Sequence, residues 1–275
     1  MKQILKAAFF AVVLLGATAT FTSCGSNDDN QQGGTVQAGT DVNPLKVFTG
    51  GLPVSLDGAT LTKNAKGQVT AIKTKDETVT FEYKDAATRA TAAAPQVVMT
   101  IQGSEEKLVC NLYLGSDGFV KHCDETETYK GESPQKETWD FTYNSDGQLL
   151  TMLRSEGGNE RTIVKYNGGN IVEVTNTSDE KPGDKDICKI SYTSKNILSP
   201  IPNKGCLMIF DEIFDIDMDE MIYAYYAGLL GKATKHLPIS CVDEGGDEDI
   251  FTWIINAQGY PTSLEYDNDK YTFTW

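Results

Sequence analysis

The stretch Phe141-Thr-Tyr-Asn-Ser-Asp-Gly-Gln-Leu-Leu-Thr-Met152 decides the fold. Apolar and polar residues alternate on both sides of Asn-Ser-Asp-Gly, which is the pattern of two β-strands joined by a tight turn. Asn and Asp tolerate left-handed backbone conformations and Gly adopts them without steric cost, so this tetrapeptide favours a hairpin. An isolated hairpin cannot bury its apolar face, and the sequence therefore needs further hairpins beside this one.

Four other segments repeat the pattern of a strand, a polar turn and a second alternating stretch. They span residues 61–72, 164–174, 190–198 and 253–264. Hairpins that follow each other along the chain pair most simply with their neighbours. The sequence thus predicts a mainly β fold, an antiparallel hairpin meander that forms a curved sheet or a barrel-like single domain.

One segment departs from this pattern, and it predicts a short helix around 217–230. Asp217 is its expected N-cap, Glu220 completes a variant of the capping box, and Gly231 is the expected stop. Its apolar residues fall on one stripe at helical spacing. We expect this helix to lie on the sheet or to close one end of a barrel.

The N-terminal segment has the features of a lipoprotein precursor. Lys2 and Lys6 precede an apolar run of about ten residues, too short for a spanning helix, which needs about 20. The residues before Cys24 resemble a lipobox, so we expect a signal peptide at 1–23, a lipid on Cys24 and a flexible acidic, Gln- and Gly-rich tether at 24–44. The folded domain is then 45–275. The alternative is an ordinary secretory peptide followed by an incidental cysteine.

This anchor predicts an outer-membrane protein held by its acyl chains and displayed at the cell surface. Asp28 and Asp29, just behind Cys24, resemble a surface-export tag, and the periplasmic face is the alternative location. Several acyl chains make such attachment effectively permanent.

The charge excludes one class of partner. The chain has 24 Lys and Arg against 39 Asp and Glu. Without the two lysines of 1–23 these become 22 against 39, a net charge of about −17. Nucleic-acid binding needs basic patches, so no nucleic-acid partner is expected. No cofactor is expected beyond the covalent lipid.

Five cysteines follow Cys24, and their odd number leaves at least one thiol without a partner in the chain. A hairpin loop at Gly115-Ser-Asp-Gly118 places Cys110 opposite Cys123, which predicts a disulfide between them. The alternative is two small apolar residues meeting in a core, and a one-residue bulge would also change the register.

Two sets of residues are candidates for ligand binding. The turn at 243–249 offers flexible glycines and carboxylates for weak calcium binding, against the simpler interpretation of a solvated acidic surface. Three tryptophans could stack on a glycan or a peptide, unless they are core positions of the sheet. The calcium candidates are Asp243, Glu244, Asp247, Glu248 and Asp249, and the stacking candidates are Trp139, Trp253 and Trp275.

The sequence carries little sign of catalysis. His122 and His236 are its only histidines, and no Gly-x-Ser-x-Gly elbow is present. We therefore expect a non-enzymatic binding or assembly protein. The alternatives are a secreted, glycan-active hydrolase that uses scattered carboxylates, and an accessory subunit of an outer-membrane uptake or export complex. Three or more acids converging in one aromatic-lined cleft would favour the hydrolase, and acids spread over loop tips would favour the binding protein.

The repeated Tyr-Asn-x-Asp-Gly hairpins are similar to the tyrosine–aspartate repeats of large bacterial surface proteins. The body from about residue 43 resembles a family of uncharacterised gut-bacterial lipoproteins with a porin-like fold, most clearly at 43–48, 204–211 and 223–239. The resemblance implies a barrel-like antiparallel sheet and no recognised catalytic residues.

The aromatic end Tyr271-Thr-Phe-Thr-Trp275 resembles the last strand of membrane barrels. Lys165 and Glu173, however, lie among the apolar positions of two strands, and a spanning strand needs an uncharged lipid face. We expect a lipid-tethered barrel in water, with an outer-membrane protein partner as a further expectation.

Overall fold

The computed structural model describes residues 42–84 and 94–275. The signal segment, Cys24 and nearly all of the tether lie outside these residues. The first described residue, Val42, is already buried although it precedes the expected boundary at 45, and the short 3-10 helix η1 (Pro44–Lys46) follows it. Asn43 caps this helix by accepting a hydrogen bond from the Leu45 N–H at 3.0 Å.

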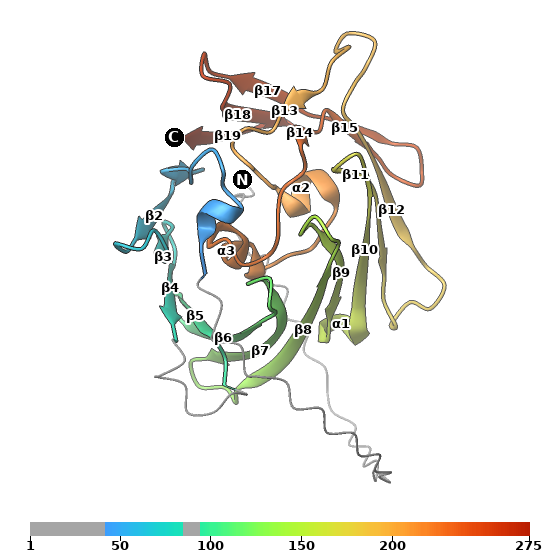
Figure 1. The fold of residues 1–275 in the computed structure, drawn as a ribbon. Helices are drawn as coiled ribbons and strands as arrows, with labels where there is room; N and C mark the ends of the chain where they lie inside the picture. The colour runs from blue at the N-terminus through green and yellow to red at the C-terminus, as the bar shows by residue number, and fades with distance from the viewer. Residues whose placement is uncertain (1–41, 85–93) are drawn as a thin grey trace, which may run out of the picture.

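Seventeen strands form one antiparallel sheet that is nearly closed into a barrel (Figure 1). This confirms the predicted mainly β meander. The strands of the sheet are β1 (Ser55–Leu56), β2 (Ala59–Lys63), β3 (Val69–Lys73), β4 (Thr78–Tyr83), β5 (Val97–Gln102), β6 (Glu106–Leu114), β7 (Val120–Tyr129), β8 (Gln135–Tyr143), β9 (Leu149–Arg154), β10 (Glu160–Asn167), β11 (Asn170–Thr177), β12 (Asp186–Ser191), β15 (Ser240–Val242), β16 (Glu248–Ile250), β17 (Thr252–Ile255), β18 (Pro261–Tyr266) and β19 (Asp269–Thr274).

The order of strands around the barrel largely follows the chain. From β2 to β12 each strand pairs with the next, after which β12 pairs with β15 and β15 with β16. Only Phe251 separates β16 from β17, and β17 continues the meander through β18 to β19. The short β1 pairs with both β19 and β2, so Ser55 faces Thr274 on one side and Thr60 on the other. The two ends of the meander therefore meet.

Three of the predicted hairpins use the same turn. In each, an Asn side-chain oxygen accepts two backbone N–H bonds of 2.9–3.0 Å, and a Gly three residues later has φ between +81° and +87°. A left-handed residue is what Gly supplies without strain. The pairs are Asn64 with Gly67, Asn144 with Gly147, and Asn256 with Gly259. The hairpins predicted at 61–72, 141–152 and 253–264 are confirmed, and β10–β11 confirms the one at 164–174.

The hairpin predicted at 190–198 is wrong. Residues up to Ser191 form β12, but the chain then turns without a glycine and no return strand follows, leaving Leu198 83% exposed. β12 pairs instead with β15, about fifty residues further along the chain. A two-stranded ribbon of β13 (Ile201–Pro202) and β14 (His236–Leu237) brackets the intervening segment.

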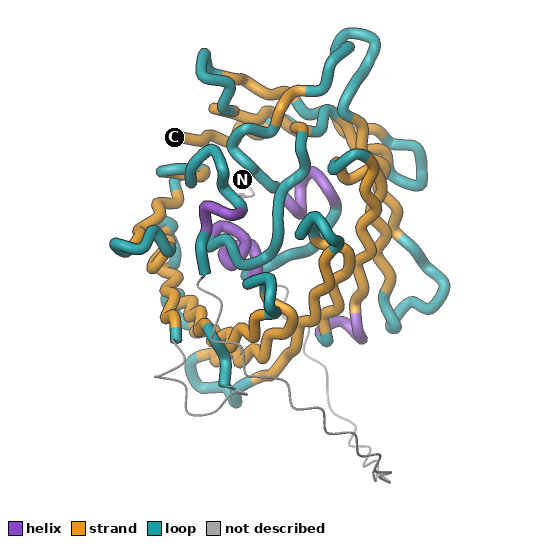
Figure 2. The backbone as a smooth tube through the Cα atoms, in the orientation of Figure 1, coloured by secondary structure: helices purple, strands orange, loops and turns teal. Residues whose placement is uncertain are grey.

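That intervening segment fills the barrel. We call residues 203–235 the plug, and Figures 1 and 2 show its helices and loops inside the ring of strands. It contains α2 (Phe210–Phe214) and α3 (Met221–Tyr226), while the one-turn α1 (Glu156–Asn159) lies between β9 and β10. Every residue from Met221 to Gly231 is buried. A helix that is apolar all round belongs in a core.

The predicted helix at 217–230 is present but shorter, and it lies inside the barrel instead of on the sheet or across one end. It starts after Glu220 without a side-chain cap and ends at Tyr226, with Ala227 as C-cap, because Gly228 takes φ +78° before the expected stop at Gly231. Two of its three buried tyrosines donate their hydroxyls to backbone carbonyls, and the third, Tyr223, donates to Glu77 Oε1. The Tyr225 hydroxyl donates to Cys206 O at 2.7 Å, and the Tyr226 hydroxyl donates to Met208 O at 2.8 Å.

The cysteines pair differently from the prediction. Cys110 and Cys123 are free buried thiols, because a bulge at Tyr113 and a longer turn shift the β6–β7 register by two residues. Cys110 therefore faces Glu125, and Cys123 faces Leu112. The disulfide of the described residues joins Cys188 to Cys241 on the paired strands β12 and β15, with Cα atoms 6.0 Å apart.

Among the described residues, no helix has the length and apolar character needed to cross a membrane.

Candidate functional site

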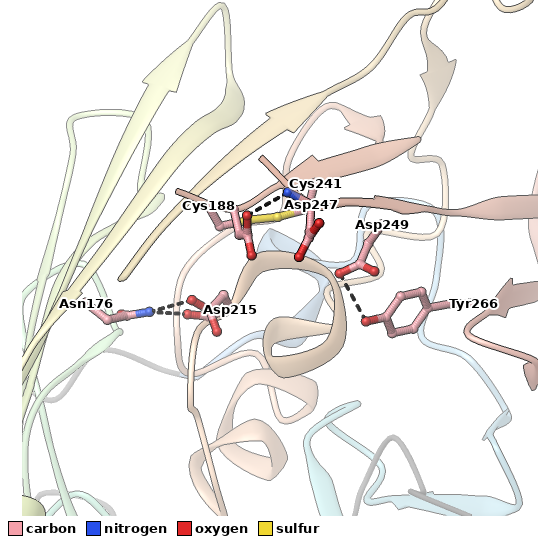
Figure 3. The surroundings of a disulfide bond; sticks show 8 residues. Asn176, Cys188, Asp215, Cys241, Asp247, Asp249 and Tyr266 are labelled. Carbon is pink, nitrogen blue, oxygen red and sulfur yellow. Dashed lines mark hydrogen bonds between the residues drawn. A yellow bond between two sulfur atoms is a disulfide. The ribbon is translucent and has the colours of Figure 1, made fainter. Parts of the chain in front are cut away.

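An acidic cleft of about 680 Å³ opens beside the disulfide. It lies between β12, β15, α2 and the turn that joins β18 to β19 (Figure 3). Nine of its sixteen lining residues are acidic, and none of the described residues that line it is basic. The acids are Asp186, Asp211, Glu212, Asp215, Asp243, Glu244, Asp249, Asp267 and Asp269.

Burial and repulsion between like charges shift the pKa of a carboxyl group in this cleft. Burial raises the pKa of Asp215, and the charges of Asp186 and Asp211 act in the same direction. The Asn176 amide opposes the rise by donating a hydrogen bond of 3.1 Å to the Asp215 carboxylate. A concave surface of one sign focuses its field and attracts counter-ions. The cleft is therefore suited to a cationic ligand.

Tyrosines supply the aromatic surface of the cleft. The Tyr266 hydroxyl donates to Asp249 Oδ2 at 3.2 Å (Figure 3). Burial, followed by the negative charge of Asp249, raises the pKa of Tyr266 to about 12. Tyr271 is the second lining aromatic residue. Both rings keep their protons at neutral pH, but Tyr271 is only 3% exposed, so Tyr266 offers the aromatic surface that a ligand can contact.

The predicted calcium turn contributes to the cleft only in part. Asp243, Glu244 and Asp249 line it, whereas Asp247 and Glu248 do not. The Asp247 N–H donates to Asp243 Oδ1 at 2.9 Å, which closes the turn. Within the described chain, no three of these five carboxylates come close enough together to hold one metal ion. The turn thus supplies charge to a larger surface.

The three tryptophans lie away from the cleft. Trp139 is fully buried inside the barrel, so it has no surface for stacking on a ligand. Trp253 and Trp275 are half-buried, and their indole N–H groups donate to the carbonyls of Pro238 and Pro261, each at 2.7 Å. The alternative interpretation, that these residues are core positions of the sheet, describes Trp139 best.

A second polar cluster, which the sequence did not reveal, lies where the plug meets β6–β9. Its cation is Arg154, whose side chain is 10% exposed. The guanidinium pairs with Asp219 at 2.5 Å and with Glu156, and it lies 3.6 Å from Glu137. It also stacks over Trp139, with Cζ 4.8 Å from the ring centroid. Burial raises the pKa of Asp219 to about 6, although Arg154 acts in the opposite direction.

Beside this arginine, two carboxyl groups and two thiols are buried together. Glu125 and Glu220 are 5% and 3% exposed, and Cys110 and Cys123 are fully buried. Trp139 Nε1 donates to Glu125 Oε2 at 3.0 Å. Burial and the neighbouring Glu125 raise the pKa of Glu220 well above its usual value. One feature of the sequence could have indicated part of this group. The alternation of inward and outward residues along a strand puts residues 123 and 125 on the inward face of β7.

Comparisons with known proteins place the chain by its fold. The structure is similar to a crystal structure of a porin-like protein from Bacteroides uniformis ATCC 8492, with a TM-score of 0.56 and 16% identity over 78% of this chain and 88% of that one. A porin-like protein from Bacteroides vulgatus ATCC 8482 gives a TM-score of 0.50 and 14% identity over 78% and 91%. No curated protein matches the sequence. The model of the family described as a domain of unknown function (DUF4595) with porin-like fold matches residues 57–263. Because this match covers well over half of the chain, the protein belongs to that family.

Proposed function

We propose that this protein is an outer-membrane lipoprotein, held by acyl chains on Cys24, that binds a cationic peptide in the acidic cleft without catalysing a reaction. The observation that carries the proposal is the cleft itself, with nine carboxylates and no basic lining residue. Its volume falls within the range of about 300–1,000 Å³ typical of small-ligand sites.

The plug supports a binding role over a transport role. Large porin barrels leave an aqueous channel, whereas the interior of this barrel is occupied by buried residues of the plug, including all of α3. The acidic cleft is a concave surface that a ligand could reach. Lysine or arginine side chains of a peptide would find several carboxylates there, and the partly exposed Tyr266 would pack against their apolar stems.

The outward face of the sheet supports a barrel in water. On β10, Arg161, Ile163 and Lys165 are exposed, while Thr162 and Val164 are buried. Lys165 pairs across the strands with Glu173 at 2.5 Å. A charged residue facing lipid at mid-bilayer costs about 2–4 kcal/mol. Such a surface fits a barrel that is tethered to the membrane by acyl chains.

Binding can be tested with a fluorescent lysine- and arginine-containing peptide and fluorescence anisotropy. The test variant combines Asp186→Asn, Asp243→Asn and Asp249→Asn, and we expect it to weaken binding at least about tenfold, the equivalent of about 1.4 kcal/mol. The control variant combines Glu105→Gln, Glu132→Gln and Glu180→Gln, which removes the same charge from exposed positions outside the cleft. Equal weakening in both variants would show that net charge alone attracts the peptide. Parallel titrations with calcium and with a glycan panel identify the ligand class.

The anchor needs its own experiment. We expect Cys24→Ala to abolish fatty-acid labelling and to release the protein from membranes, because the acyl chains are its only proposed attachment. Protease shaving of intact cells should degrade the chain if it is displayed outward. Labelling that survives the substitution would refute lipidation, and full protection from protease would assign the chain to the periplasmic face.

The cleft meets the convergence criterion for a carboxylate-dependent hydrolase acting on glycans, which is therefore the second candidate. Binding is proposed first because seven of the nine acids are exposed, as acids on a charged surface are. Nine acids and two tyrosines converge in one cleft, and burial raises the pKa of Asp215, as a general acid requires. The assay is product release from a panel of oligosaccharides. Activity that is lost in Asp215→Asn and retained in the control Asp146→Asn, on an exposed turn, would establish hydrolysis in place of simple binding.

A further inference from the structure

The deepest group of metal-ligating side chains lies far from the acidic cleft. Cys110 on β6, Glu125 on β7 and Glu220 at the start of α3 each direct a ligand atom to one point, with these atoms all within 4.8 Å of one another. The three side chains are between 0% and 5% exposed. In the described chain, this is the one group of three or more such residues close enough to hold an ion.

One carboxylate oxygen of this group has no hydrogen-bond partner. Glu220 Oε1 is buried and has no hydrogen bond among the described residues. Glu125 has a hydrogen-bond donor, because Trp139 Nε1 donates to its Oε2 atom. An ionised carboxylate is very unfavourable in an apolar interior unless it is paired or coordinates a metal. Arg154, whose charge interacts with that of Glu220, is already engaged by Asp219 and Glu156.

We propose that Cys110, Glu125 and Glu220 form a buried binding site for a thiophilic divalent cation, of which zinc is the best match. The two carboxylates bring two negative charges, and the metal deprotonates the thiol outright. Cys123 lies beside this group, because its thiol contacts that of Cys110, but its sulfur is not among the ligand atoms that all lie within 4.8 Å of one another. A cation on Glu220 would satisfy the orphan oxygen and the charge of the pair together.

The donor atoms select the metal. Calcium and magnesium take oxygen ligands, whereas a thiolate favours zinc or another soft cation. Zinc sites are usually tetrahedral, with bonds of about 2.0–2.3 Å to sulfur and carboxylate oxygen. Such bonds place ligand atoms roughly 3.3–3.8 Å apart, so ligand atoms that now lie within 4.8 Å of one another would have to move closer together. The competing arrangement is a proton shared between Glu125 and Glu220 without any metal.

Cobalt titration of the wild-type full chain, purified from membranes in detergent, separates this site from the cleft. Cobalt bound by a thiolate gives a sulfur-to-metal charge-transfer absorption, which carboxylate oxygens alone do not give. The cleft offers no free thiol, because its two cysteines form the disulfide. We expect the absorption to saturate at one cobalt per chain and to disappear when zinc is added. No such absorption would overturn the proposal.

Matched variants test the ligands. Glu220→Gln keeps the side-chain volume and Cys110→Ser removes the sulfur, and we expect each to weaken zinc binding by more than about tenfold, a loss that changes in the second shell already cause. Cys206→Ser and Glu132→Gln, a thiol and an acid outside the group, should bind zinc as the wild type does. Equal binding by all four variants would refute the assignment.

A measurement on the wild type covers the case in which the buried variants do not fold. A ligand that binds only the folded state raises the melting temperature by mass action. We expect zinc to raise the melting temperature of the wild-type protein, and we expect calcium not to produce this rise. An unchanged melting temperature at saturating zinc, with circular dichroism showing a folded protein, argues for the shared proton and against the metal.

Discussion

Replacing Arg154 by Met should be among the most destabilising single changes in the barrel. Arg154 is the central cation of its cluster, and its removal takes that partner from Asp219 and Glu137, whose side chains are only 15% and 18% exposed. Breaking a buried ion pair from one side costs about 3–5 kcal/mol. The stacking over Trp139 is lost as well. Since small domains are stable by about 5–15 kcal/mol, the loss is a large part of the total.

Urea denaturation followed by tryptophan fluorescence measures this effect. With a slope of about 2 kcal/mol/M, a loss of 3–5 kcal/mol lowers the midpoint by roughly 1.5–2.5 M. Arg161→Met is the matched control, because Arg161 is exposed on the neighbouring β10 and forms no ion pair among the described residues. Its effect should stay within about 0.5 kcal/mol.

The pH dependence adds a sharper criterion. Burial raises the pKa of Asp219 to about 6, so its carboxyl group is charged at pH 8 and protonated at pH 5. An uncharged Asp219 no longer needs the guanidinium, and loss of Arg154 raises this pKa further. The destabilisation by Arg154→Met should therefore be smaller at pH 5 than at pH 8. A midpoint shift equal to that of Arg161→Met, or one larger at pH 5, would refute the assignment of Arg154 as the neutralising charge.

Three other outcomes follow from buried or strained positions. Burial raises the pKa of Glu220 in the folded state. Protonation of Glu220 therefore stabilises the metal-free fold fully below about pH 4.5, and this stabilisation is lost as the pH rises through the folded-state pKa. When melted in the presence of a chelator, the Glu220→Gln variant should lose less stability between pH 5 and 8 than the wild type does. The Cys188–Cys241 bridge closes a separation of 53 residues, for which the loop-entropy relation gives about 4 kcal/mol, so the double Ser variant should melt like the reduced wild type, well below the oxidised one. Gly231→Ala should cost more than Gly246→Ala in denaturant, because both have positive φ but only the Cβ at 231 would meet a backbone oxygen, that of Gly147, at 2.8 Å; equal losses would mean that backbone conformation alone sets the cost.

Local rules predicted the hairpins because each Asn-x-x-Gly turn carries its own geometry. The failure at 190–198 has the same origin, since that segment lacks the glycine and its strand pairs across about fifty residues. The Cys110–Cys123 pairing failed for a related reason. A bulge and a longer turn shift a register by amounts that alternation does not encode, although a shift of two keeps both thiols on the inward face.

The sites depended on contacts that no local pattern reveals. The acidic turn at 243–249 was recognisable, but the cleft also needs α2 and the β18–β19 turn, which come from distant parts of the chain. The buried group joins residues 110, 125 and 220, and only the position of the plug brings the last of them to the first two. The sequence predicted a helix-capping role for Glu220. Its burial could not be predicted locally, because it arises only when the closed barrel surrounds the plug.

The plug also constrains how the chain can fold. Residues 203–235 must enter the interior before the barrel closes, yet closure waits for β19 to reach β1, with Thr274 facing Ser55. Contacts between such distant residues make folding slow and leave apolar surface exposed in intermediates. A chain interrupted before β19 would hold a nearly complete sheet around an uncovered, tyrosine-rich segment, which is a target for chaperones and proteases.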